Sequence, residues 1–375
     1  MTRILSPEEL PVGARIARDV LSGHASTTPL LRAGAIVTEG FRSALERAGV
    51  GGVFIDDDLG EDIQTTPALT ERTRLDLTNA LTAVFAEAPK ALAKETVLSR
   101  ETIKNLEHAV ADMVEDIAEV DTSTLALTSL ASIEAYTLEH SIDVAVLGLL
   151  VATHLFNTNG RIDHTGNRTH TGLEAALCRL GCGLALHDLG KVGLPRALTL
   201  ATGTLADADR ETLEQHPLIG IGLLDDQLVS AHAKAVVRSH HERFDGSGYP
   251  DGMAGEDIPH FARIAAVVDG YSAMTTRSQH HDPVPPQIAL ATIRKGKGTK
   301  YDPEVVDALC AVVAPYPPGS EITLVDGSSG VVSSVRPEQL ELPVVRVLRD
   351  RNGAAVAPRE IDLLVARWLA PPQAA

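Results

Sequence analysis

Histidines and aspartates that could bind metal gather in the middle of this 375-residue sequence, where twelve of the fourteen histidines lie between His140 and His281. The candidates are His140, His187, Asp188, His216, His240, His241 and Asp269. Most of them stand at or near the end of an apolar helical segment. Imidazole nitrogens combined with carboxylate oxygens suit iron, manganese or zinc, and a carboxylate such as Asp188 can bridge two ions. Two ions about 3.5 to 4 Å apart generate hydroxide at neutral pH and stabilise displacement at a phosphate ester. These residues therefore predict hydrolytic chemistry, with Lys191 directing positive charge at the phosphate.

Each residue alone has a simpler interpretation. A single histidine on an apolar helix is more often a hydrogen-bonded core residue, and the adjacent pair His240 and His241 also fits an exposed turn. Cys178 and Cys182, one helical turn apart, are better explained as small buried residues than as metal ligands. The whole set favours a metal centre, because otherwise each of several buried polar groups would need its own partner.

The elements that must position these side chains are helices. Residues 120 to about 312 contain long alanine- and leucine-rich segments, and helical bundles build metal sites by pointing ligands inward from several helices. The polar stretch at 157–171 interrupts these segments and is predicted to be a surface loop.

A stripe of apolar residues predicts a further helix between 100 and 120. Its members recur at steps of three and four: Ile103, Leu106, Val110, Met113 and Ile117. The first interpretation is a helix packed on its own domain, because the stripe is too short for a sustained heptad pattern. The alternative is a homodimer through this helix.

The two ends of the chain differ from the middle. Short apolar segments separated by turn residues predict a small β-containing domain at 1–65, and Asp-Gly and Asn-Gly turns between apolar runs predict a small β domain at 315–375. Between them we expect a helical connector at 66–122 and a helical catalytic domain at 123–314. The predicted fold class is mainly α, with a helical bundle core flanked by two small β-containing domains.

Composition limits the partners and the compartment. The formal net charge of −17 disfavours binding to a nucleic-acid polymer, which depends on excess lysine and arginine. A phosphate-bearing small substrate stays compatible, because bound cations reverse the local field. The N-terminus lacks the apolar block of a signal peptide, and no window approaches the roughly 20 apolar residues of a membrane span. With three cysteines, an odd number that fits a reducing compartment, the chain is expected to be cytoplasmic.

The motifs between about 125 and 312 resemble, in order, those of HD-GYP proteins, a branch of the HD-domain metal-dependent phosphohydrolases that hydrolyse the bacterial second messenger cyclic di-GMP. They read "YTLEHS", "HDLGKVGLP", "HPLIGIGLL", "HHERFDGSGYPDG", "ARIAAVVDGYSAM" and "GKGTKYDPEVVDAL". The resemblance implies an HD-domain fold with two divalent ions, typically iron or manganese, with zinc, nickel or magnesium as alternatives. It implies that Asp188 bridges these ions and that the other ligands are His187, His216, His240, His241 and Asp269. Lys191 would assist at the phosphate, and Gly248 and Tyr249 would shape the loop on the substrate side.

Two positions depart from the family's pattern. Some members bind a third metal through a glutamate one helical turn before the residue that matches His140, but this chain has Tyr136 there. We therefore expect two ions, with His140 as a ligand or beside the ligands. Where members have a stretch resembling "ALTSDRPYR", this chain has "AMTTRSQHH", with Ser278 at the arginine's position. Arg277 and His281 are the candidates to replace that arginine in binding substrate.

The resemblance implies a phosphodiesterase that opens cyclic di-GMP to linear pGpG, and/or continues to GMP, by means of a hydroxide that bridges the metals. Serine cannot copy the planar fork of an arginine, so Ser278 leaves two alternatives open. One is hydrolysis of another nucleotide or phosphoester. The other is a catalytically weak or inactive sensor or scaffold that signals through protein partners at the GYP surface.

Overall fold

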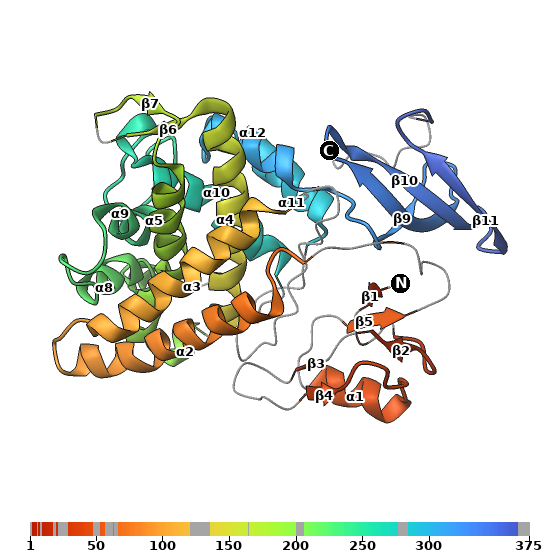
Figure 1. Ribbon diagram of the computed structural model, residues 1–375, viewed down its shortest axis with the longest axis horizontal. Helices are drawn as coiled ribbons and strands as arrows, with labels where there is room; N and C mark the ends of the chain where they lie inside the picture. Colours follow the sequence, from red (N-terminus) through yellow and green to blue (C-terminus); the bar gives the residue numbers. More distant parts are fainter. Residues whose placement is uncertain are drawn as a thin grey trace.

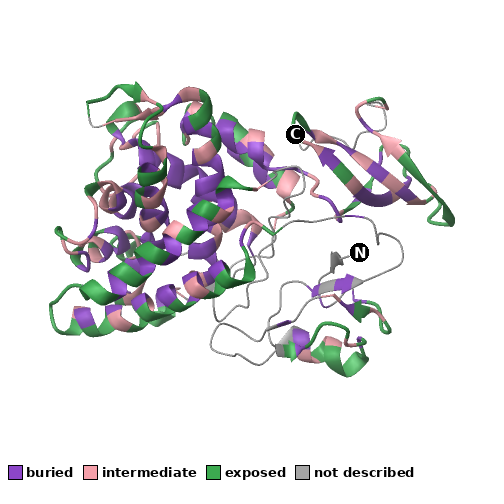
Figure 2. Ribbon diagram, in the orientation of Figure 1, coloured by how far each residue is buried: buried purple, intermediate pink, exposed green. Residues whose placement is uncertain are grey.

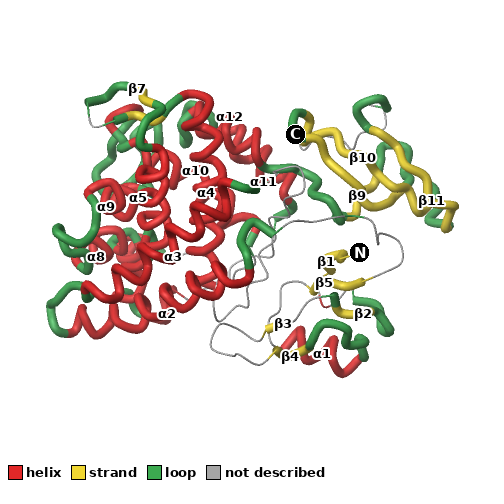
Figure 3. Tube along the Cα trace, viewed as in Figure 1, coloured by secondary structure: helices red, strands yellow, loops and turns green. Residues whose placement is uncertain are grey.

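The computed structural model shows a helical body, with small sheets formed by the two ends of the chain (Figures 1 and 3). The prediction of a mainly α fold flanked by β-containing parts is confirmed. The structure describes residues 2–5, 7, 10–17, 20–21, 29–47, 53–56, 63, 67–120, 136–163, 165–199, 206–276 and 284–366.

Helices α2 (Glu71–Ala93) and α3 (Arg100–Ala118) form a hairpin that packs on the rest of the helical body. Thr70 and Ser99 cap them, because each hydroxyl accepts a hydrogen bond from the backbone N–H three residues on. The predicted stripe on α3 is buried between α2 and α5 (Leu173–Leu186): Ile103, Leu106, Val110, Met113 and Ile117. The chain's own helices therefore cover the stripe, as the first interpretation expects.

Helix α4 (Tyr136–Asn159) lies at the centre of the helical body. The other helices of the body, besides α2, α3 and α5, are η3 (Leu189–Gly193), α6 (Arg196–Thr199), α7 (Asp207–Leu213), α8 (His216–Gly222), α9 (Ala231–Ser239), η4 (Gly255–Asp257), α10 (His260–Thr275), α11 (Pro286–Lys295) and α12 (Pro303–Val312). Helix α4 contacts α5, α10 and α12, and its buried apolar residues belong to one core cluster with those of the neighbouring helices. Figure 2 shows that buried residues gather inside the helical body. The segment predicted as a connector, 66–122, shares this core with the segment predicted as the catalytic domain.

Helix α4 differs from one expectation. Its Thr137–Asn159 segment is long and apolar enough to cross a membrane by length and composition alone, although no such segment was expected. However, 72% of the most apolar window is buried within the protein. The apolar side chains of α4 are therefore used in the core of the helical body.

The polar stretch at 157–171 was predicted to be a loop, and this prediction is wrong in part. Strands β6 (Arg161–Ile162) and β7 (Arg168–Thr169) pair there as a short antiparallel hairpin. Asp163 closes the turn, because its Oδ1 accepts hydrogen bonds from the backbone N–H groups of Thr165 and Asn167 at 2.8 and 3.0 Å. The same Asp, Asn and Gly residues that indicate a loop also close tight turns, so composition alone does not separate the two.

The N-terminal part has its own small core. A three-stranded antiparallel sheet has the order β1-β5-β2, and a two-stranded sheet pairs β3 with β4. The elements are β1 (Thr2–Leu5), β2 (Arg15–Ile16), β3 (Val20–Leu21), β4 (Pro29–Leu31), α1 (Glu39–Arg47) and β5 (Val53–Asp56). Buried side chains from both sheets and α1, among them Ile16, Leu45 and Ile55, form a cluster separate from the core of the helical body.

The C-terminal part is a four-stranded antiparallel sheet in the order β11-β10-β9-β8. Its strands are β8 (Glu321–Thr323), β9 (Ser329–Arg336), β10 (Gln339–Arg349) and β11 (Ala355–Asp362). The predicted Asp-Gly and Asn-Gly turns join β8 to β9 and β10 to β11, with Gly327 and Gly353 at φ of 84° and 80°. Glycine adopts such positive φ values without steric cost, which explains its place in both turns.

His260, at the start of α10, predicts a pH dependence of stability. Its ring is buried, and burial, together with the positive charge of Arg263, lowers the pKa of His260 to about 4. The unfolded chain, with an ordinary pKa near 6.5, binds a proton as the pH falls through that value, whereas the folded chain resists protonation until about pH 4. Folding free energy should therefore be lost in this window, by about 2 kcal/mol from this group between pH 7.5 and 5.

The test is urea unfolding of the parent and of His260→Gln at several pH values. Glutamine does not titrate, so the variant should lose less stability than the parent between pH 7.5 and 5. Equal losses in the two proteins would contradict the prediction.

Candidate metal centre

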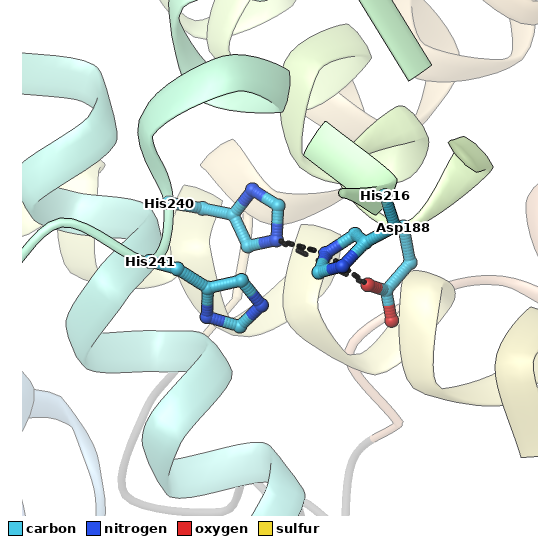
Figure 4. A group of neighbouring side chains, drawn as sticks. All are labelled: Asp188, His216, His240 and His241. Carbon is cyan, nitrogen blue, oxygen red and sulfur yellow. Dashed lines mark hydrogen bonds and ion pairs between the residues drawn. The ribbon is translucent and has the colours of Figure 1, made fainter. Parts of the chain in front are cut away.

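The seven candidate ligands come from separate elements and meet at one place. His140 lies in the first turns of α4, Asp269 lies in α10, and the other five stand where helices begin or end. Their ligand atoms form two adjoining groups, within each of which all atoms lie within 4.8 Å of one another. The first group is Asp188, His216, His240 and His241 (Figure 4), and the second group is His140, His187 and Asp269.

Three of the imidazoles are held by backbone carbonyls. The Nδ1 atoms of His187, His216 and His240 lie 2.7, 2.7 and 3.1 Å from the carbonyl oxygen three residues earlier. A carbonyl oxygen only accepts, so each Nδ1 carries the hydrogen and donates it. In the neutral ring the Nε2 atom then has a free lone pair directed at the centre, which is the arrangement of a metal-binding histidine.

The inward-facing Nε2 atoms of His216 and His240 have no hydrogen to share. Nε2 of His216 lies 3.2 Å from Nε2 of His240. Burial lowers the pKa of His216, and burial together with neighbouring imidazoles lowers that of His240 to about 3, so both rings are neutral at pH 7. In the described part of the chain, the buried Nε2 of His187 also has no hydrogen-bond partner. A cation would satisfy all three nitrogens, so this donor set fits a bound metal.

Both aspartates span the two groups. Asp188 Oδ1 lies 3.5 Å from Nε2 of His216, while its Oδ2 lies 3.4 Å from Nε2 of His187. Asp269 Oδ1 lies 3.0 Å from Nε2 of His140, and its Oδ2 lies 3.9 Å from Nδ1 of His241. Bridging was expected of Asp188 alone, so the double reach of Asp269 is a new feature.

The charges of the centre are consistent with a cation. Burial acts to raise the pKa of Asp188, but Lys191 and the nearby histidines hold it well below its usual range. The pKa of Asp269 is likewise held down against burial, chiefly by its hydrogen bond with His140. Both carboxylates are therefore negatively charged at neutral pH, as cation binding requires.

Comparison with known proteins agrees with this geometry. The HD domain family model matches residues 165–305, which include every candidate ligand except His140. A cyclic di-GMP phosphodiesterase from Pseudomonas aeruginosa is 29% identical over 308 residues, which are 81% of this chain and 67% of the relative. A response regulator from Xanthomonas campestris, named as a cyclic di-GMP phosphodiesterase, is 39% identical over 127 residues, 33% of each chain.

The chain carries an HD domain. A probable cyclic di-GMP phosphodiesterase from Vibrio cholerae is 40% identical over 131 residues, 33% of this chain and 30% of the relative. This chain thus spans about a third of the length of two of these relatives. Among solved structures, an HDG"Y"P protein from Bdellovibrio bacteriovorus covers 82% of this chain and 98% of its own length, with a TM-score of 0.46 and 16% identity.

Lys191 lies at the edge of the ligand groups in the HD domain and is partly exposed. The Nζ atom donates a hydrogen bond to Asp188 Oδ2 at 2.6 Å, and the Lys191 side chain is 27% exposed whereas that of Asp188 is 2% exposed. Burial acts against the charge, but the Asp188 carboxylate raises the pKa of Lys191, so the ammonium stays protonated. It is therefore a fixed positive charge at the edge of the centre.

We expect Lys191→Met to keep the metal ions and to lose most of the turnover. Removing one preorganised charge from a reaction centre typically lowers kcat about 10²- to 10³-fold. Metal analysis and initial rates on the same preparations would measure both quantities. Unchanged turnover, or loss of the ions, would contradict this role.

The loop that carries the "GYP" residues lies against the ligands. The ring of Tyr249 packs on that of His241, with ring centroids 4.7 Å apart and an interplanar angle of 33°. A Cβ atom on Gly248 would lie 2.5 Å from the Cα atom of Glu242 and 2.5 Å from the carbonyl oxygen of His241, so only glycine fits this close approach. Tyr249, predicted on the substrate side, also lies beside the imidazole of His216.

Some predicted residues lie outside the part of the chain that the structure describes. Arg277, Ser278 and His281 are not among the described residues, so the stretch that departs from the family's pattern is not placed. Of Tyr136, the structure describes only its backbone, as the first residue of α4.

Two residues near the centre were missed by the sequence reasoning. Ser272 Oγ lies 3.2 Å from Nδ1 of His140, and the carboxylate of Glu242 binds the loop described above. Glu242 could have been noticed, because it directly follows the pair His240 and His241 in "HHERFDGSGYP". Ser272 stands one turn after Asp269 on α10, which is a weaker signal.

Proposed function

We propose that this chain is a metal-dependent phosphodiesterase that hydrolyses a cyclic dinucleotide, with cyclic di-GMP as the first candidate. The observation that carries the proposal is the pair of adjoining ligand groups spanned by the carboxylates of Asp188 and Asp269. The names of the relatives support the substrate class, since they are cyclic di-GMP phosphodiesterases and, at 31% identity over 126 residues, a 3'3'-cGAMP-specific phosphodiesterase from Vibrio cholerae.

In this proposal the centre holds two divalent ions, with iron or manganese as the first candidates. The first group would hold one ion and the second group the other, with Asp188 shared between them. When bound, such ions lower the pKa of water to near neutrality and stabilise negative charge on a phosphate. Imidazole and carboxylate ligands without thiolate fit iron and manganese better than a structural zinc site.

The chain's own residues would orient the reaction. The backbone carbonyls hold the imidazoles of His187, His216 and His240 with Nε2 inward, so the ligands need no rearrangement. The protonated Lys191 would donate a hydrogen bond to a phosphate oxygen and neutralise its growing charge. Hydrolysis adds the hydroxyl of water to phosphorus and its remaining proton to the departing ribose oxygen, which gives linear pGpG and, after a second cleavage, GMP.

The test is incubation of the protein with cyclic di-GMP and Mn²⁺, or with Fe²⁺ without oxygen, followed by chromatography. The proposal predicts pGpG or GMP from the parent and none from Asp188→Asn, which keeps the shape but loses the carboxylate charge. The absence of product with cyclic di-GMP and with 3'3'-cGAMP would contradict it.

One observation favours a second candidate. Ser278 stands where the family has an arginine that contacts the substrate. The loss of that arginine is compatible with a protein that binds the nucleotide but does not hydrolyse it. In that case the chain would be a sensor or scaffold with signalling partners at the GYP surface. Tight binding of cyclic di-GMP with no product would support this candidate. So would equal results for the parent and Lys191→Met when their hydrolysis of other nucleotides is measured.

A further inference from the structure

The carboxylate of Glu242 lies directly after the ligand pair and is almost fully buried, at 1% exposure. Its Oε1 accepts a hydrogen bond from the backbone N–H of Asp251 at 2.7 Å, and its Oε2 accepts one from that of Met253 at 3.0 Å. A buried carboxylate is costly unless it is satisfied, and here backbone amides satisfy it. Glu242 therefore ties the far end of the 243–254 loop to the residue next to His241.

The middle of the same loop covers His241. The backbone N–H of Tyr249 donates to the carbonyl oxygen of His241 at 3.3 Å. Gly248 brings the loop backbone into direct contact with residues 241–243, and the Tyr249 ring lies on the His241 ring. Glu242 thus holds the end of the 243–254 loop through its two hydrogen bonds, while the contacts of Tyr249 hold the middle of the same loop against His241.

His241 differs from the other ligands of the first group. The rings of His216 and His240 are each held by a backbone carbonyl. In the described part of the chain, no hydrogen bond to the His241 ring is found, and its nearest charged partner, Asp269 Oδ2, lies 3.9 Å away. The orientation of this ring therefore depends on packing, and Tyr249 supplies a packed face.

We propose that Glu242 is a positioning residue for the first ligand group: through the 243–254 loop, it holds Tyr249 against His241 and so sets the direction of that imidazole. This inference rests on the proposed function in taking the first group as a metal site. Partners that orient a metal ligand typically change metal affinity about 10- to 100-fold when they are removed. The effect should fall on one ion, because the contacts of Glu242 and Tyr249 act on His241, which belongs to the first group.

The test titrates metal-free protein with Mn²⁺ by calorimetry. Glu242→Ala and Tyr249→Leu should each weaken one of the two ions about 10- to 100-fold and leave the other within about twofold. Arg238→Met is the matched control, because Arg238 binds the side chain of Asp251 at 2.7 and 2.8 Å on the exposed side of the same loop. It should bind both ions as the parent does.

A second readout needs no metal. In metal-free protein, the imidazole NMR signals of His241 should shift in Glu242→Ala and in Tyr249→Leu, and should stay in place in Arg238→Met. If the ions bind to both variants as to the parent, or if both ions weaken equally, the inference is overturned. If the parent binds no ions, the proposed function fails and the His241 signals alone decide: unchanged signals in both variants overturn the inference. Parent protein that binds both ions but releases no product also contradicts the proposed function alone.

Discussion

Asp188→Ala should lose both metal ions and essentially all turnover. One oxygen of Asp188 faces His216 and the other faces His187, so a single substitution removes a ligand from each group. We expect kcat to fall at least about 10³-fold, more than the loss of one charge-stabilising donor costs. Metal content by elemental analysis and product formation by chromatography would measure the two effects.

The matched control for this prediction is Asp209→Ala, because Asp209 is an exposed aspartate on α7 that belongs to neither ligand group. It should keep both ions and the parent's rate. If Asp188→Ala retained two ions, Asp188 would not be shared between them, and the bridging role would be wrong.

The second large effect is expected for Gly190→Ala. Gly190 lies in η3 between Asp188 and Lys191, and η3 packs directly on the backbone of α8. A Cβ atom at Gly190 would overlap the carbonyl oxygen of His216 and lie 2.5 Å from the backbone nitrogen of Gly220. Backbone atoms cannot move aside as side chains do, so η3 and α8 would have to separate. We expect a loss of about 3 kcal/mol in the free energy of unfolding.

The same separation would move Asp188 away from His216, so Gly190→Ala should also weaken metal binding. Gly222→Ala is the control, because Gly222 ends α8 and its Cβ would meet no heavy atom within 4 Å. Urea unfolding and metal titration of both variants would separate local crowding from a general effect of losing a glycine. A Gly190→Ala protein as stable as Gly222→Ala would contradict the steric argument.

Much of the candidate site could be predicted from the sequence. The seven candidate ligands follow from residue type and, for most of them, from positions at or near helix ends, and the structure brings all seven together. The mainly α fold follows from the long apolar segments and is confirmed. Helix ends are favourable places for such prediction, because a ligand there can reach the inside of a bundle while the helix keeps its own hydrogen bonds.

Features that depend on side-chain rotamers and on long-range packing could not be predicted. That Asp269 spans both groups depends on the rotation of one carboxylate between α4 and the end of α9. That Glu242 binds the 243–254 loop depends on how the loop folds back, which no spacing encodes. The hairpin at 161–169 was missed because its turn residues also occur in irregular loops.

The most direct test of the central claim is a crystal structure of the manganese-loaded protein with anomalous scattering measured at the manganese edge. The account predicts two peaks about 3.5 to 4 Å apart, with Asp188 in contact with both ions, His216, His240 and His241 around one ion and His187 beside the other. A single peak, or two peaks of which one lies away from these residues, would contradict it.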